Sequence, residues 1–107
     1  MPRTLINVPR TARRGEIIEI RAMIAHPMET GHRMGPNGIA IPRNIVHRFV
    51  CTYGTETVFA ADLFPALSAN PFIAFSTVAT ESGTLTFAWT EDGGAVHLAT
   101  AEITVTG

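Results

Sequence analysis

The residues best suited to chemistry in this chain are a lone cysteine, Cys51, and four histidines. A thiol beside a histidine becomes a nucleophile when the imidazole takes its proton. His47 precedes Cys51 by four residues in a strand-like segment, which places the two side chains about 13 Å apart along the same face. They could not share a proton at that distance. The residues around Cys51 are typical of a strand, and we therefore predict a buried, structural thiol.

A metal site is the second chemistry to consider. His26 and His32 lie near Glu29 in one segment, so a loop metal site is conceivable, although the histidines do not fall at the spacing of a metal motif. The chain has no phosphate-binding loop of the G-x-x-x-x-G-K type and no G-x-S-x-G elbow. We predict no cofactor, no metal and no catalytic activity. A small metal- or thiol-dependent enzyme that uses Cys51 and the loop histidines remains the alternative.

The charges are segregated along the chain. All eight basic residues are arginines between Arg3 and Arg48, where only three glutamates oppose them, and six acidic residues and no basic one follow from Cys51 onward. Neighbouring strands could simply neutralise each other. A local arginine patch facing an anionic ligand or partner would explain the pattern as well.

Length and composition indicate one folded domain over residues 1–107. Of the 107 residues, 46% are hydrophobic and 16% are charged, which supports a real core. A single cysteine excludes an intrachain disulfide. The net charge of −1 and the lack of an aromatic-studded basic surface give no support to nucleic-acid binding. No apolar run could span a membrane, and the N-terminus lacks an apolar signal segment.

Period-two alternation recurs in short segments separated by Gly, Pro and Asn, which is typical of β-strands. We predict about seven strands and no helix, hence an all-β, immunoglobulin-like β-sandwich, with a small barrel as the alternative. The expected strands are Leu5–Val8, Glu16–Ala25, Ile45–Tyr53, Val58–Asp62, Phe72–Ala79, Thr84–Thr90 and Val96–Val105. The stretch His26–Arg43 has no clear period and is predicted to be a functional or mobile loop.

The strand that begins at Phe72 is apolar on both faces. Phe72 and Ala74 point one way, and Ile73 and Phe75 point the other. A sandwich strand buries only one face, so the second must be covered either by the preceding segment Phe64–Asn70 or by another protein. The alternation alone does not decide which pair points outward.

Six short strings, in this order and spacing, resemble the SoxZ family, the small partner subunits of a thiosulfate-oxidation carrier complex. They are Arg14–Ile20, His26–Gly31, Ile41–Arg43, Ala61–Leu63, Ser68–Phe72 and Thr80–Thr84. The resemblance covers nearly the whole chain, and its most specific parts are His-Pro-Met-Glu-Thr-Gly and Ser-Ala-Asn-Pro.

The resemblance implies a heterodimer with SoxY, the chain that carries the sulfur substrate on a cysteine within a glycine-rich arm near its own C-terminus. The present sequence ends Ile-Thr-Val-Thr-Gly, so it is similar to the non-carrier half. Its implied role is to hold the carrier and to help present the arm to the sulfur-oxidising enzymes. In this family the complex acts in the periplasm, and the small subunit is exported with its signal-bearing partner.

The resemblance also suggests where contacts lie. The candidate partner contacts are Phe72, Ile73, Ala74, Phe75 and Met28. The candidate contacts with the anionic cargo or with an incoming enzyme are Arg33, Arg43 and Arg48. A generic adhesion-type sandwich domain is a further alternative, and it predicts no heterodimer with a cysteine-tailed partner.

Overall fold

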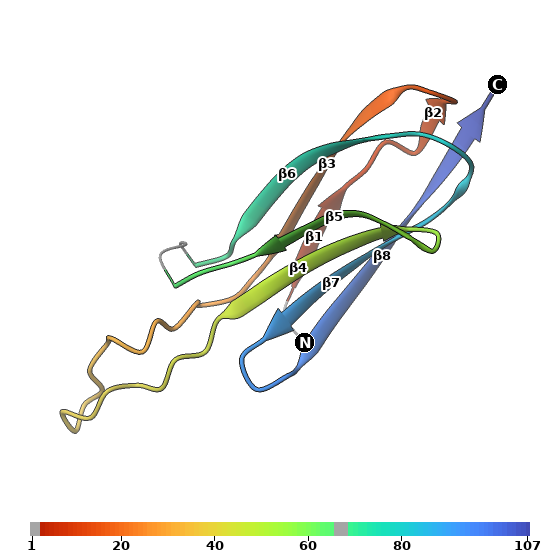
Figure 1. Cartoon of the computed structure of the whole chain (residues 1–107). Coiled ribbons are helices and arrows are strands. Elements are labelled where there is room, and N and C mark those ends of the chain that lie inside the picture. The colour runs from red at the N-terminus through yellow and green to blue at the C-terminus, as the bar shows by residue number, and fades with distance from the viewer. Residues whose placement is uncertain (1–2, 66–68) are drawn as a thin grey trace.

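The computed structural model describes residues 3–65 and 69–107, and these residues form eight strands in two sheets without a helix (Figure 1). The order is β1-β3-β6 in one sheet and β2-β8-β7-β4-β5 in the other. The strands are β1 Thr4–Asn7, β2 Thr11–Arg13, β3 Ile17–Ile24, β4 Val46–Tyr53, β5 Glu56–Asp62, β6 Phe72–Val78, β7 Gly83–Glu91 and β8 Val96–Thr106. The predicted immunoglobulin-like sandwich is confirmed. Residues 66–68 of the predicted covering segment Phe64–Asn70 lie outside the described residues.

Strand β2 is not among the seven strands that the sequence predicts. Its residues pair in parallel with the end of β8, with Thr11 opposite Thr104 and Arg13 opposite Thr106. Three residues are too few to show an alternating pattern. Their partner also comes from the far end of the chain, so only the assembled sheet reveals the strand.

The core lies between the two sheets and follows the alternation of the sequence. On β3 the side chains of Ile18, Ile20, Ala22 and Ile24 are buried. The opposite sheet contributes an aromatic layer, in which the rings of Phe49 and Trp89 lie 5.3 Å apart. Aromatic rings at such spacing contribute stability beyond the apolar area that they bury.

Strand β4 departs from simple alternation near its start. Val46 and Phe49 are both fully buried although they lie three residues apart. The pairing of β4 with β7 shifts register between Val46 and Arg48, and this irregularity changes the phase of the strand. His47 therefore does not lie on the core face with Cys51, which corrects the expectation that the two share a face.

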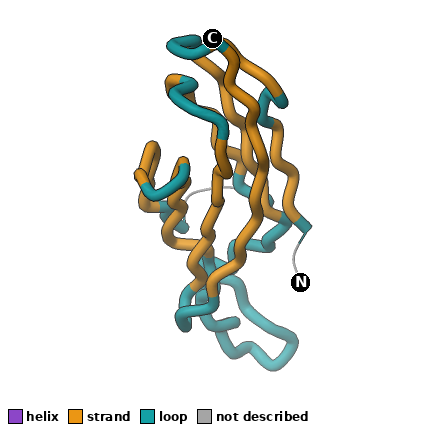
Figure 2. Tube along the Cα trace, turned by 90° about the vertical axis from the view of Figure 1, so that its right-hand side faces the viewer, coloured by secondary structure: helices purple, strands orange, loops and turns teal. Residues whose placement is uncertain are grey.

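The long loop between β3 and β4 is an irregular hairpin that extends beyond the sandwich (Figures 1 and 2). Isolated bridges join Glu29 to Asn44 and Met34 to Ala40, and the Gly35 N–H donates to the Ile39 carbonyl at 2.8 Å. The stretch predicted as an irregular loop therefore has backbone pairing of its own. With this hairpin extended, the molecule measures 61 × 20 × 20 Å.

Candidate partner-binding face and long loop

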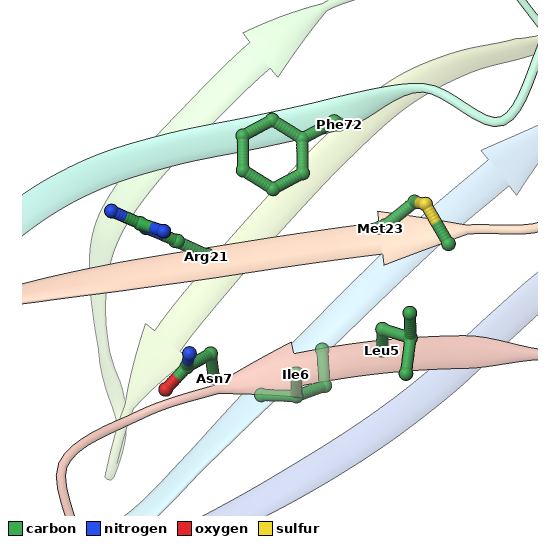
Figure 3. Close-up of a pocket in the computed structure, with 6 residues that line it drawn as sticks. All are labelled: Leu5, Ile6, Asn7, Arg21, Met23 and Phe72. Carbon is green, nitrogen blue, oxygen red and sulfur yellow. The ribbon is translucent and has the colours of Figure 1, made fainter.

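The outer face of the three-stranded sheet carries a row of apolar side chains. The strand register sets Leu5 opposite Met23 and Met23 opposite Phe72, so that one residue from each strand contributes to the row (Figure 3). Leu5 is 66% exposed and Phe72 is 60% exposed. Cross-strand neighbours on one face lie within about 5.5 Å of each other and form a continuous surface. An exposed apolar row of this kind is typical of a protein-binding surface.

A hollow of about 420 Å³ lies over this row, lined by Leu5, Ile6, Asn7, Arg21, Met23 and Phe72 (Figure 3). The Nε of Arg21 donates to the carboxylate of Glu19 at 2.7 Å, so the basic group at the rim already has an acidic partner. None of the six lining residues is a nucleophile or a carboxylic acid. The hollow is therefore suited to receive an apolar side chain from another molecule.

The structure decides which side of β6 faces outward. Phe72 and Ala74 are exposed, whereas Ile73 is half-buried and Phe75 lies in the core, where its ring stacks on Phe59 at 4.5 Å. The side chains of Ile73 and Phe75 thus support the fold. Of the four residues predicted as partner contacts on this strand, Phe72 and Ala74 are the exposed ones.

Met28, predicted as a partner contact, is not on the surface. Its side chain is buried, and its sulfur accepts a hydrogen bond from the Val46 N–H at 3.4 Å. The residue adopts a positive φ of 54°, which turns the chain at the base of the loop. The assignment of Met28 to the partner contacts is corrected, because its side chain packs in the core.

Each of the three candidate arginines is bound to a carboxylate. Arg33 pairs with Glu29, Arg43 donates twice to Asp92 at 2.8 and 3.1 Å, and Arg48 donates to Asp62 at 2.7 Å. The guanidinium of Arg43 is the main reason that the pKa of Asp92 falls to about 2. The structure therefore neutralises these arginines with acids from three places: Glu29 lies in the long loop, Asp62 ends β5, and Asp92 lies in the turn after β7. The pair of Arg48 on β4 with Asp62 on β5 is in line with the first of the two explanations of the charge pattern.

A buried histidine fastens the base of the loop to the sandwich. The Nδ1 of His26 accepts a hydrogen bond from the Met28 N–H at 3.0 Å, and its Nε2 lies 2.6 Å from a carboxylate oxygen of Glu91. Because Nδ1 accepts, the proton of the neutral ring is on Nε2 and is donated to Glu91. The other oxygen of Glu91 binds His97. Hydrogen bonds from His97 and then His26 lower the pKa of Glu91 against the opposing effect of burial.

The same histidine joins two of the strings that carry the family resemblance. The His26 N–H donates to the side-chain oxygen of Asn70 at 2.9 Å, and the Asn70 N–H donates to the His26 carbonyl at 2.7 Å. Asn70 has a positive φ of 55° just before Pro71, a conformation that asparagine tolerates better than most residues. These bonds hold the start of the loop against the start of β6.

The sites considered for catalysis find no support in the described residues. Cys51 is fully buried, and burial raises the pKa of its thiol to about 12. Glu29 is engaged by Arg33, and His26 is engaged by Glu91. Within residues 3–65 and 69–107, no three His, Cys, Asp or Glu side chains are arranged to hold a metal ion. Nor do these residues include a helix long and apolar enough to cross a membrane.

Sequence reasoning missed four residues of this arrangement. Leu5 and Met23 complete the outer apolar row. The available signal was that each is an apolar residue at a position that alternates with the residues facing the core. Glu91 and His97 complete the network of His26. No local pattern marks them, since Glu91 lies 65 residues from His26 along the chain.

Comparison with solved structures finds similar folds at low sequence identity. A superoxide reductase (neelaredoxin) from Ignicoccus hospitalis matches with a TM-score of 0.76 and 16% identity, covering 96% of this chain and 80% of that one. The sulfur carrier protein SoxY from Chlorobium limicola f thiosulfatophilum matches with a TM-score of 0.68 and 16% identity, covering 97% of this chain and 79% of that one. At such identities the likeness shows a shared fold. A search of curated proteins finds no match.

Comparison with protein families gives a more specific result. The family model described as sulphur oxidation protein SoxZ matches residues 6–102, which is nearly the whole chain. The matched region contains Met23 and Phe72 of the outer apolar row, the long loop and the histidine network at its base. The chain therefore belongs to the SoxZ family of sulphur oxidation proteins.

Proposed function

We propose that this chain is the non-catalytic subunit of a periplasmic sulfur-carrier heterodimer, in which it binds a SoxY-family carrier during thiosulfate oxidation and is exported with that partner. The observation that carries the proposal is the exposed apolar row of Leu5, Met23 and Phe72 in a chain of the SoxZ family. A stable heterodimer needs such a surface, because burial of apolar area is the main driving force of association.

Phe72 is the central contact of the proposed interface. It is the largest exposed side chain of the row, and it borders the hollow into which a partner side chain would fit. Aromatic residues in a desolvated interface often contribute about 2 kcal/mol or more to binding. Ala74 lies next to it on the outward side of β6 and allows close approach of the partner.

Two substitutions on one strand test this interface. Phe72→Asp should abolish co-purification with a SoxY-family chain from the same source and leave the isolated subunit folded, because the charge lies on the exposed face. Phe75→Asp should instead unfold the subunit, because it buries a carboxylate against Phe59. A melting curve of each variant should accompany the pull-down. Retention of the partner by folded Phe72→Asp would place the interface elsewhere.

The long loop is the proposed contact with the anionic cargo or with a sulfur-oxidising enzyme, through Arg33, Arg43 and Arg48. Each guanidinium has five N–H donors, and its carboxylate partner uses only one or two of them. If the three arginines steer an anionic partner, their joint replacement by Gln should slow association at low salt, and the effect should shrink at high salt. Unchanged association at low salt would leave them as structural ion pairs.

The proposal that the subunit is not an enzyme is supported by the state of its only thiol. A nucleophilic cysteine needs a lowered pKa and access to substrate, whereas Cys51 has a raised pKa and no exposure. Sulfur transfer by the complex should therefore depend on the cysteine of the carrier subunit. Cys51→Ser should retain carrier function in protein that folds.

A further inference from the structure

Strand β6 has an unpaired edge. It is the last strand of the order β1-β3-β6, so one side pairs with β3 and the other side pairs with no strand among the described residues (Figure 1). Its seven residues, Phe-Ile-Ala-Phe-Ser-Thr-Val, include no charge and no proline. The register with β3 runs without a shift from Met23 opposite Phe72 to Ile17 opposite Val78. The edge is therefore long, regular and uncharged.

The hydrogen bonds at both ends of β6 show which backbone groups face this edge. The Ile24 N–H donates to the Pro71 carbonyl at 3.4 Å, and the Ala79 N–H donates to the Glu16 carbonyl at 2.8 Å. In an antiparallel pair every second residue exchanges hydrogen bonds with its partner strand. The odd-numbered residues of β6 therefore bond to β3. The N–H and C=O groups that point to the free edge belong to Phe72, Ala74, Ser76 and Val78, and no described residue pairs with them.

The other sheet edges are protected in ordinary ways. Strand β1 has four residues, and β2 has three and carries Arg13. Strand β5 begins with Glu56 and ends with Asp62. Short length and charge both discourage the pairing of an edge with another chain. Among the edge strands of the described residues, β6 alone is neither short nor charged. An exposed edge of this length and composition promotes aggregation unless another chain pairs with it or covers it.

We propose that the free edge of β6 pairs in antiparallel orientation with an extended strand of the SoxY-family carrier subunit. This inference rests on the proposed function and names the mode of binding. The SoxY structure from Chlorobium limicola f thiosulfatophilum has the same fold, with a TM-score of 0.68, so a carrier of that fold offers an edge equivalent to β6. Two such sandwiches related by a pseudo-two-fold axis join equivalent edges in antiparallel orientation and cover both edges in one contact.

Strand addition also continues the apolar row. A strand beside β6 sets one of its side chains next to Phe72, on the side opposite Met23. The outward side chains of β6 are Phe72, Ala74, Ser76 and Val78, none of which is charged. The partner residue beside Phe72 should therefore be apolar. Main-chain hydrogen bonds supply affinity in this mode, and the side-chain row supplies specificity.

Two alanine-to-proline substitutions test the edge. Ala74→Pro removes an N–H that faces the free edge of β6 and obstructs a neighbouring strand, without removing a bond to β3. Ala60→Pro is the matched control on the free edge of β5. Ala60 is exposed. The Leu63 N–H donates to the His47 carbonyl at 2.8 Å, so the backbone groups of Ala61 and Phe59 also point to β4. The backbone N–H of Ala60 therefore points to the free edge of β5. Affinity for the carrier chain, measured by titration calorimetry, should fall about tenfold or more in Ala74→Pro and stay unchanged in Ala60→Pro.

The outcomes separate the mode of binding from the proposed function. If the wild-type chain does not bind a SoxY-family carrier, the proposed function is wrong. If it binds and folded Ala74→Pro binds equally well, strand addition at β6 is wrong. If Ala74→Pro instead dissolves a homodimer and leaves carrier binding intact, the edge serves a second copy of this chain, which also overturns the proposal.

Hydrogen exchange keeps the proposal testable if Ala74→Pro does not fold. In the wild-type complex the N–H groups of Ala74, Ser76 and Val78 should exchange at least about tenfold more slowly than in the free subunit. The N–H groups of Ala60 and Asp62 on β5 should show no change. Equal exchange of the β6 groups in the free and bound subunit would refute strand addition.

Discussion

Replacement of Cys51 by serine should lower the free energy of unfolding by an amount that the surroundings of the thiol define. The side chain is fully buried in the core layer that contains Phe49 and Phe87. Among the described residues, the Thr52 carbonyl is the one hydrogen-bond acceptor of its sulfur, at 4.0 Å. A hydroxyl placed there cannot make a normal hydrogen bond, which needs about 2.5–3.0 Å. Burial of an unpaired hydroxyl costs about 1–3 kcal/mol.

Cys51→Ala is the control that separates polarity from volume. It removes the sulfur without adding a polar group, and the loss of one buried atom of this size costs about 1 kcal/mol. Serine fills more of the space than alanine does and should nevertheless be at least as destabilising. For a chain of this length, 1 kcal/mol corresponds to a change of about 4 °C or more in Tm.

Denaturant unfolding followed by tryptophan fluorescence measures both variants. Trp89 is the only tryptophan, and its side chain is fully buried, so its emission reports exposure of the core. A Cys51→Ser variant as stable as the wild type, or more stable than Cys51→Ala, would refute the structural role of the thiol. Alkylation of the wild type is a second measurement. With a pKa of about 12 against the usual 9.0, the thiolate fraction at pH 8 is about a thousandfold smaller, and native protein should scarcely react.

Two further predictions concern the loop and its base. Hydrogen bonds with Arg43 are the main reason that the pKa of Asp92 is lowered from 3.8 to about 2. The ionised carboxylate therefore stabilises the folded protein above about pH 4, and this stabilisation is lost as the pH falls toward 2. Acid titration of stability should show this loss in the wild type and a smaller loss in Asp92→Asn. Gly31→Ala should lower Tm more than Gly38→Ala. Both glycines have a positive φ, at 88° and 70°, so both substitutions strain the backbone. At Gly31 the new Cβ would also lie 3.1 Å from the Cβ of Arg43, whereas at Gly38 it would meet no atom within 4 Å. Equal Tm values would show that the contact with Arg43 is relieved at no cost.

Much of the fold follows from local alternation. The strand β3 and the buried position of Cys51 were predicted correctly, because both depend on residue types that alternate along a short segment. The number of strands was predicted to within one. The short strand β2 was missed because its pairing with β8 has no local signal.

The candidate interface could be predicted only in part. The sequence identified β6 as unusual, since both of its faces are apolar at the start. It could not choose between Phe72 and Phe75, because the choice depends on which face β6 turns toward the aromatic layer of the other sheet. The same limit explains Met28, whose side chain turns into the core at a residue with positive φ.

The sequence by itself determined that the chain forms an all-β sandwich and resembles the SoxZ family, since alternation and short strings are local properties. Only the tertiary structure decided how distant groups meet. Arg43 meets Asp92 across 49 residues, and His26 meets Glu91 across 65. Strand order likewise leaves β6 at the edge of its sheet. Such contacts depend on the order and register of strands, and these are set by the packing of the whole core.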